Sequence, residues 1–143
     1  MESTNGEYWL TDDPASIDLD VVCELLSDTY WAADRPRDLV ALSVRSSLCF
    51  SVHHRGRQIG MARVLTDQGA SSYVCDVVVH ADHRGRGIGK WLMECILEHP
   101  AVRRTRVLLI TRDAQAFYRE LGFVTHPFEC MVRADPDANP RGT

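Results

Sequence analysis

Three glycines and three cations stand close together in the stretch RGRGIGK, residues 84–90. Glycine lets the backbone take positive φ and come close to a ligand. If a helix begins just after Gly87, its first amides lack partners and lie at the positive end of the helix dipole. Such amides bind phosphate without a metal. The stretch therefore predicts a pyrophosphate site, to which Arg84, Arg86 and Lys90 add positive charge.

Two better-known glycine motifs do not match this stretch. A P-loop requires G-x-x-x-x-G-K-[ST], but Arg84 stands at the first glycine and Trp91 replaces the metal-binding hydroxyl. A dinucleotide-binding fingerprint requires G-x-G-x-x-G, whereas the spacing here is G-x-G-x-G. The alternative of a glycine-rich turn with solvated cations is weaker, because a strand, the loop and a helix follow in the right order.

The segments around the loop predict a mixed α/β sheet. Residues 73–79, YVCDVVV, are almost all β-formers and indicate a buried central strand. Apolar residues then recur at helical spacing from Ile88 until Pro100. Within residues 16–31 apolar residues recur at helical spacing from Leu19 to Tyr30, which predicts a helix with Asp18 as N-cap. We also predict helices over 36–47 and 113–123. A hairpin is predicted over 48–66, and further strands over 106–110 and 128–132. Residues 1–7 and 134–143 are expected to be frayed.

Length and composition narrow the class of protein. The chain has 143 residues, 45% of them apolar, which suits one domain. Its net charge of −4 argues against a general nucleic-acid binder. Neither a membrane span nor a signal peptide is recognisable. The five scattered cysteines suit a reducing compartment, so we expect a cytoplasmic protein without a membrane partner.

Two stretches resemble the signatures of the GNAT superfamily of N-acetyltransferases. The stretch DTYWAADRP, residues 28–36, further resembles a bacterial subgroup of small members. The acetyl-CoA signature R/Q-x-x-G-x-G/A is matched by Arg84, Gly87 and Gly89. The second signature, N-x-x-A-x-x-F/L-Y-x-x-x-G-F, resembles TRDAQAFYRELGF, residues 111–123, in which a threonine replaces the asparagine. Both motifs lie at the separation typical of the family.

The resemblance implies one GNAT domain over residues 1–143, with its core at about 8–133. Its central, twisted mixed sheet would have about six to seven strands, splayed at the central strands and flanked by about four helices. Acetyl-CoA would be the co-substrate, with its pantetheine arm along the central strand and its pyrophosphate on the glycine loop. The residues implied in binding it are Val77, Val78, Val79, Arg84, Gly85, Arg86, Gly87, Ile88, Gly89, Lys90, Ala114 and Phe117.

The resemblance also suggests catalytic roles. Tyr118 would donate a proton or hydrogen bond to the departing sulfur, and a backbone N–H near Val78 would stabilise the oxyanion. Asp76 is the carboxylate inside the central strand, and it is a candidate base. A structural hydrogen bond is an equal alternative for Asp76, and water could serve as the base. No third ligand accompanies His80 and His83, so no metal is expected.

The acceptor site would be built from the first two helices and the final strand hairpin. Tyr30 and Trp31, with nearby carboxylates, suit a cationic amine, while Arg35 could hold the carboxylate of an amino acid. Trp31 could equally be core packing. We therefore predict acetyl transfer to a primary amine of a small molecule or amino acid by direct attack. The alternatives are a protein or peptide acceptor and a non-catalytic acyl-CoA sensor, and a homodimer is kept open.

Overall fold

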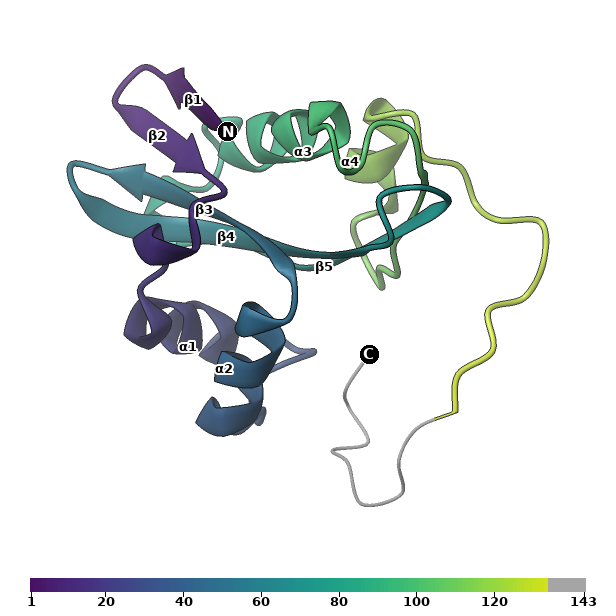
Figure 1. Ribbon diagram of the computed structural model, residues 1–143, viewed down its shortest axis with the longest axis horizontal. Coiled ribbons are helices and arrows are strands. Elements are labelled where there is room, and N and C mark those ends of the chain that lie inside the picture. Colours follow the sequence, from purple (N-terminus) through teal and green to yellow (C-terminus); the bar gives the residue numbers. More distant parts are fainter. Residues whose placement is uncertain (134–143) are drawn as a thin grey trace.

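The computed structural model describes residues 1–133, and in them the chain forms one six-stranded sheet whose strands follow chain order (Figure 1). Only β5 and β6 run parallel, and every other neighbouring pair is antiparallel. The strands are β1 (Glu2–Asn5), β2 (Tyr8–Thr11), β3 (Leu48–His54), β4 (Arg57–Thr66), β5 (Ser71–Val79) and β6 (Arg106–Leu108). The expected mixed α/β class is confirmed.

Helices cover both faces of the sheet, with α1 and α2 on one face and α3 and α4 on the other (Figure 1). They are α1 (Leu19–Ser27), α2 (Arg37–Arg45), α3 (Ile88–Glu98) and α4 (Gln115–Glu120). Asp18 caps α1 as predicted, because its carboxylate accepts from the amides of Asp20 and Val21. None of the helices within residues 1–133 is long and apolar enough to cross a membrane.

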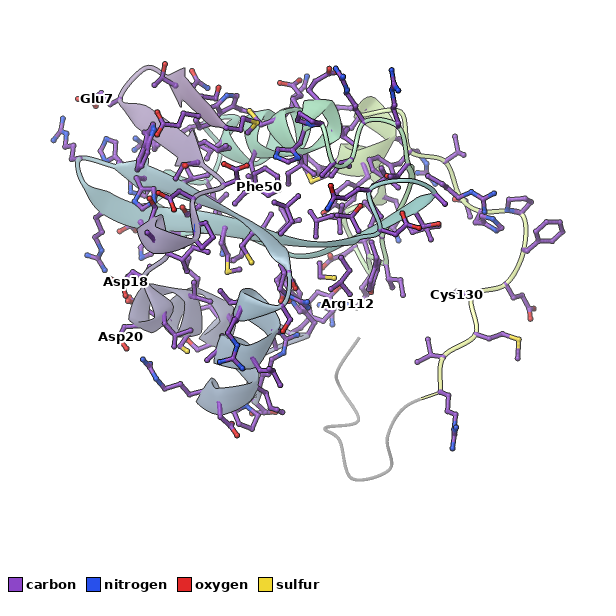
Figure 2. All side chains as sticks on the ribbon, in the orientation of Figure 1. Glu7, Asp18, Asp20, Phe50, Arg112 and Cys130 are labelled. Carbon is purple, nitrogen blue, oxygen red and sulfur yellow. The ribbon has the colours of Figure 1, made fainter. Side chains whose placement is uncertain are left out.

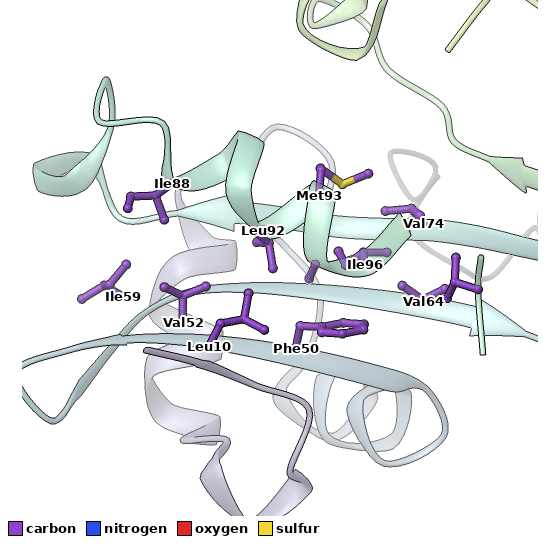
Figure 3. Close-up of a cluster of buried hydrophobic side chains, with 12 residues drawn as sticks. Leu10, Phe50, Val52, Ile59, Val64, Val74, Ile88, Leu92, Met93 and Ile96 are labelled. Atoms are coloured by element: carbon purple, nitrogen blue, oxygen red, sulfur yellow. The ribbon is translucent and has the colours of Figure 1, made fainter. Parts of the chain in front are cut away.

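Each face of the sheet has its own apolar cluster. On one face, α3 buries Leu92, Met93 and Ile96 against Phe50 and its neighbours from the strands (Figure 3). On the opposite face, α1 packs its buried side chains against residues of β4 and β5. The sheet is therefore covered on both sides around β4 and β5, which holds β5 and the glycine loop after it in place.

Three predictions about the elements are wrong. Residues 2–5 are not frayed but pair with β2, because backbone hydrogen bonds can join a polar segment to a sheet edge. The first helix ends at Ser27, so Tyr30 and Trp31 lie in the turns before α2. Residues 128–132 form no strand within the described part of the chain, since nothing in it pairs with them. Residues 134–143 lie outside the described residues.

The sheet opens beside β5. This strand pairs with β6 only through Ser71, Ser72 and Tyr73, and from residue 74 onward its only strand partner within residues 1–133 is β4. The β4–β5 register also shifts between Met61 and Arg63, opposite a residue of β5 with positive φ, Asp76. The resulting gap leaves residues 74–79 without a neighbouring strand on the side away from β4, within residues 1–133.

Candidate active site

The glycine loop has the geometry that the sequence predicted. Gly85 and Gly87 take φ of 74° and 75°, and Gly87 is the N-cap of α3. That left-handed conformation is strained for other residues. The first turn of α3 contains no acidic residue, and residues 84–87 are exposed. The first amides of α3 therefore face solvent in a positively charged surrounding, which fits a pyrophosphate.

The side chains of Arg84 and Arg86 connect this loop to other parts of the sheet by hydrogen bonds. Arg84 Nε donates to the Val79 carbonyl at 2.9 Å, which ties the loop to the end of β5. Arg86 Nη1 donates to the Tyr8 hydroxyl at 3.2 Å, and the same hydroxyl lies 2.9 Å from His83 Nδ1. Tyr8 was missed by the sequence reasoning. No local signal could have found it, because its partners lie 75 and 78 residues away.

The second motif lies directly beside the loop. A Cβ built on Gly89 would be 3.7 Å from Phe117 Cζ, so the start of α3 and the start of α4 are in contact. Thr111 Oγ1 accepts from the Ala114 amide at 3.0 Å and closes the turn that leads into α4. The threonine that replaces the family's asparagine therefore stabilises this turn, although α4 itself has no side-chain cap.

Tyr118 lies on α4, half-buried between aromatic neighbours. Its ring packs against Phe117 and Phe123, with centroid distances of 5.0 and 5.7 Å. Burial raises the pKa of the Tyr118 phenol, and repulsion from the ionised form of Tyr30 adds to the increase. Its hydroxyl makes no hydrogen bond within residues 1–133. The phenol is therefore protonated at neutral pH and free to donate.

Asp76 is the centre of a buried polar network. Trp31 Nε1 donates to its Oδ1 at 2.9 Å, while Arg35 Nη1 and Arg63 Nε each donate to Oδ2 at 2.8 Å. The Asp76 side chain is only 2% exposed. Arg63 also donates to Ser47 Oγ at 3.2 Å. Sequence reasoning missed Arg63, which lies on the neighbouring strand.

The electrostatics of this network keep Asp76 ionised. Burial by itself would raise the pKa of Asp76, but hydrogen bonds from Arg35 and Arg63 outweigh it and lower the pKa below its ordinary value. Two guanidinium groups face one carboxylate, so the cluster carries an excess of positive charge. Both carboxylate oxygens are engaged, which makes Asp76 a weak proton acceptor.

Comparison with known proteins gives the family. Residues 45–125, more than half of the chain, match the model of the acetyltransferase (GNAT) domain. The chain belongs to the GNAT family. Its structure resembles that of a candidate GNAT acetyltransferase from Xanthomonas campestris, with a TM-score of 0.84 and 36% identity over 90% of this chain and 94% of that one.

Other relatives agree with this assignment. The chain is 29% identical to FG08082, a candidate acetyltransferase of Gibberella zeae, over 83% of this chain and 80% of that protein. It is 32% identical to ycf52, an uncharacterised N-acetyltransferase of Porphyra purpurea, over 73% of this chain and 64% of that protein. The chain is thus a GNAT-family N-acetyltransferase, an enzyme of a family that uses acetyl-CoA, and its acceptor is not identified.

In this GNAT protein the predicted acceptor residues lie near the catalytic candidates. Tyr30 and Trp31 contact each other edge to face, at a centroid distance of 5.0 Å. Trp31 and Arg35 both bind Asp76. Arg112, which sequence reasoning missed, lies 3.8 Å above the Tyr30 ring, and its amide donates to the Tyr30 hydroxyl at 3.2 Å. Tyr30 therefore links the α1–α2 segment to the start of the second motif.

One cavity contains none of the predicted site residues. Its volume is about 530 Å³, and it lies between the end of α2 and the ends of β4, β5 and β6. Ser47 lines it and also binds Arg63, so the cavity adjoins the Asp76 network. Within residues 1–133 no group of three or more His, Cys, Asp or Glu side chains is placed to hold a metal.

Proposed function

We propose that this GNAT protein transfers the acetyl group of acetyl-CoA to a primary amine of a small molecule or amino acid by direct attack. The observation that carries the proposal is the gap beside residues 74–79 of β5, with the glycine loop at the end of that strand and the donor phenol of Tyr118 nearby. Acetyl-CoA supplies the activated thioester, and the residues of the chain bind and polarise it.

Binding is divided between the strand and the loop. We propose that backbone groups of Val77 and the backbone N–H of Val79 bind the amide-bearing pantetheine arm, because no strand pairs with them on the open side within residues 1–133. The Val79 carbonyl already accepts from Arg84. The amides of residues 85–90 take the pyrophosphate, and Lys90, Arg84 and Arg86 add charge. No metal is required, since amides and cations provide the complementary charge.

Two groups act on the reacting atoms. An N–H near Val78 stabilises the oxygen that becomes negative as the amine attacks. Tyr118 donates a hydrogen bond to the sulfur as the carbon–sulfur bond breaks. Full proton transfer from tyrosine to a thiolate is uphill by about 2 kcal/mol from reference pKa values, and the raised pKa of Tyr118 increases this difference. Stabilisation by a hydrogen bond therefore describes its role better than complete proton transfer.

We propose that water, and not Asp76, takes the proton from the attacking amine. Asp76 as the base stays a prediction, but its contacts favour the structural alternative, because an attacking amine would have to displace Trp31 or Arg35. We propose that Asp76 instead orients these two side chains toward the acceptor. The cluster of Arg35, Arg63 and Asp76 has a net positive charge. This charge suits an acceptor that carries a carboxylate besides its amine.

An acceptor screen tests the proposal. Purified protein and acetyl-CoA would be incubated with amino acids, their decarboxylated amines and short peptides, and released CoA thiol would be measured with a chromogenic disulfide. We expect turnover with at least one amino acid and weaker turnover with its decarboxylated amine. Turnover of peptides alone would shift the function to a protein or peptide acceptor. Binding of acetyl-CoA without turnover of any amine would favour a sensor.

A further inference from the structure

A group of polar rings lies beside the glycine loop, and the proposed reaction does not use it. Tyr8 on β2 and His54 on β3 are cross-strand partners, and their ring centroids lie 4.8 Å apart. His83, the last residue of the 3₁₀ turn Ala81–His83, meets both rings edge to face, at centroid distances of 5.6 Å from Tyr8 and 5.0 Å from His54. Two strands and the segment before the loop therefore meet in one cluster of side chains.

The Tyr8 hydroxyl joins the loop to this cluster. Arg86 Nη1 donates to the hydroxyl oxygen at 3.2 Å, which leaves the hydrogen of the hydroxyl for an acceptor. Within residues 1–133 the acceptor that it contacts is His83 Nδ1, at 2.9 Å. The hydroxyl thus accepts from Arg86 and donates to His83, and a neutral His83 carries its proton on Nε2. We call these three residues the Arg86–Tyr8–His83 chain.

The surroundings of His83 favour its neutral form. Burial lowers its pKa, and repulsion from the charged forms of His54, Arg86 and His80 lowers it further, while Asp82 acts in the opposite direction. A neutral imidazole has an acceptor nitrogen, whereas a protonated one has two donors and no acceptor. Protonation of His83 would therefore direct two cationic donors at one hydroxyl oxygen.

The carboxylate nearest to this cluster is already engaged. Glu7 lies at the turn between β1 and β2 (Figure 2). It accepts from Arg55 at 3.1 Å, and its other oxygen lies 3.3 Å from His54 Nε2. Arg86 forms no ion pair with a carboxylate within residues 1–133. The charge of Arg86 is therefore available to an anion at the loop.

We propose that Tyr8 is a positioning residue for CoA, because its hydroxyl, anchored on neutral His83, holds the Arg86 guanidinium ready for a phosphate at the glycine loop. The inference rests on the proposed binding of the CoA pyrophosphate at this loop. A free arginine side chain loses rotamer freedom when it binds a ligand, and holding it in advance lowers that cost. Tyr8 is a firm support, since its ring packs against the apolar cluster of the sheet.

The proposal also makes the contribution of Tyr8 depend on pH. Above the pKa of His83 the Arg86–Tyr8–His83 chain is intact. As the pH falls through that pKa, Nδ1 gains a proton, Tyr8 loses its acceptor, and His83 repels Arg86. The part of the CoA affinity that depends on Tyr8 is therefore present at neutral pH and lost in acid.

A double-mutant cycle tests the positioning role. Calorimetric titration at about pH 8 would give the Kd of CoA for the wild type, Tyr8→Phe, Arg86→Ala and the double variant. We expect Tyr8→Phe to raise Kd about fivefold when Arg86 is present, and to have no effect when Arg86 is replaced. Tyr73→Phe, the same change at the opposite end of β5 from the loop, is the matched control and should leave Kd unchanged. An equal effect of Tyr8→Phe in both backgrounds would give Tyr8 a purely structural role and overturn the proposal.

Repeating the titrations in acid tests the role of His83. At about pH 5 the effect of Tyr8→Phe on Kd should vanish, because His83 is then protonated. In a His83→Asn background it should persist at about pH 5, since the amide oxygen accepts at either pH. The CoA phosphates titrate alike in every variant, so their contribution cancels. With native His83, a Tyr8→Phe effect of the same size at both pH values would overturn the proposal.

NMR of the wild type gives a readout that needs no variant. The imidazole nitrogen shifts of His83 at about pH 8 should show the proton on Nε2. A proton on Nδ1 would overturn the proposal, even if Tyr8→Phe fails to fold. A wild type that binds no CoA would contradict the proposed function and this inference together. CoA binding without coupling between Tyr8 and Arg86 would contradict this inference alone.

Discussion

The Tyr118 phenol is half-buried, protonated and without a hydrogen-bond partner in residues 1–133, which suits a donor to a developing thiolate. Tyr118→Phe removes this hydroxyl and keeps the ring in its contacts with Phe117 and Phe123. We expect kcat to fall by about 10²-fold or more, with little change in the affinity for CoA. Steady-state kinetics and calorimetric titration measure the two quantities. Unchanged kcat with reduced stability would assign Tyr118 to the core.

Substitution of Asp76 distinguishes a structural role of this residue from a catalytic one. Asp76→Asn leaves the partly buried Arg35 and Arg63 without their counter-charge, and breaking a buried ion pair costs about 3–5 kcal/mol in free energy of unfolding. Urea unfolding at neutral pH measures this loss. Asp20→Asn, at an exposed ion pair with Arg37, is the control and should cost less than about 1 kcal/mol.

The same network predicts a pH dependence of stability. The folded-state pKa of Asp76 is lowered from 3.8, so its contribution is complete above the unfolded-state value and is lost as the pH falls through the folded-state value. The stabilities of wild type and Asp76→Asn should therefore begin to approach each other as the pH falls below about 4, and the difference should be lost below the folded-state pKa. A variant with normal stability, low kcat at neutral pH and recovery at high pH would instead identify Asp76 as the base.

The loop between β5 and α3 acts through its backbone. In Gly87→Val a branched side chain must take φ of 75°, which costs about 1–3 kcal/mol of stability, and its Cβ enters the space where a phosphate would approach. Gly56→Val is a matched control, since Gly56 has φ of 79° and an equally open Cβ position in the β3–β4 turn. Both variants should lose similar stability, but only Gly87→Val should lose CoA binding. Equal CoA affinity in the two would contradict the loop assignment.

The whole molecule should be stabilised by its co-substrate. A ligand that binds only the folded chain at about 100 times its Kd adds about 2.7 kcal/mol, which for a domain of this size raises Tm by roughly 5–10 °C. Thermal unfolding with CoA in the presence of EDTA measures this shift. We expect the same shift with magnesium. A shift that appears only when magnesium is added would require a metal-dependent phosphate site.

Local patterns in the sequence were sufficient for much of this protein. The positive φ of Gly87, the helix face from Ile88 and the Asp18 cap each depend on residues a few positions apart, so their spacing predicts them. The two motifs likewise predicted that the glycine loop and Tyr118 belong to one site. These features follow from backbone sterics and helical periodicity, which act over short stretches of chain.

Only the tertiary structure shows which residues, far apart in the chain, contact one another. Asp76 on its own fitted a base or a structural group, and the choice depends on Arg35 and Arg63, which the fold brings to it from other elements. Residues 128–132 were predicted to form a strand from their composition, but no strand in the described part of the chain pairs with them. A buried carboxylate and an unpaired strand both take their roles from the groups that satisfy them, and no short stretch of sequence contains those groups.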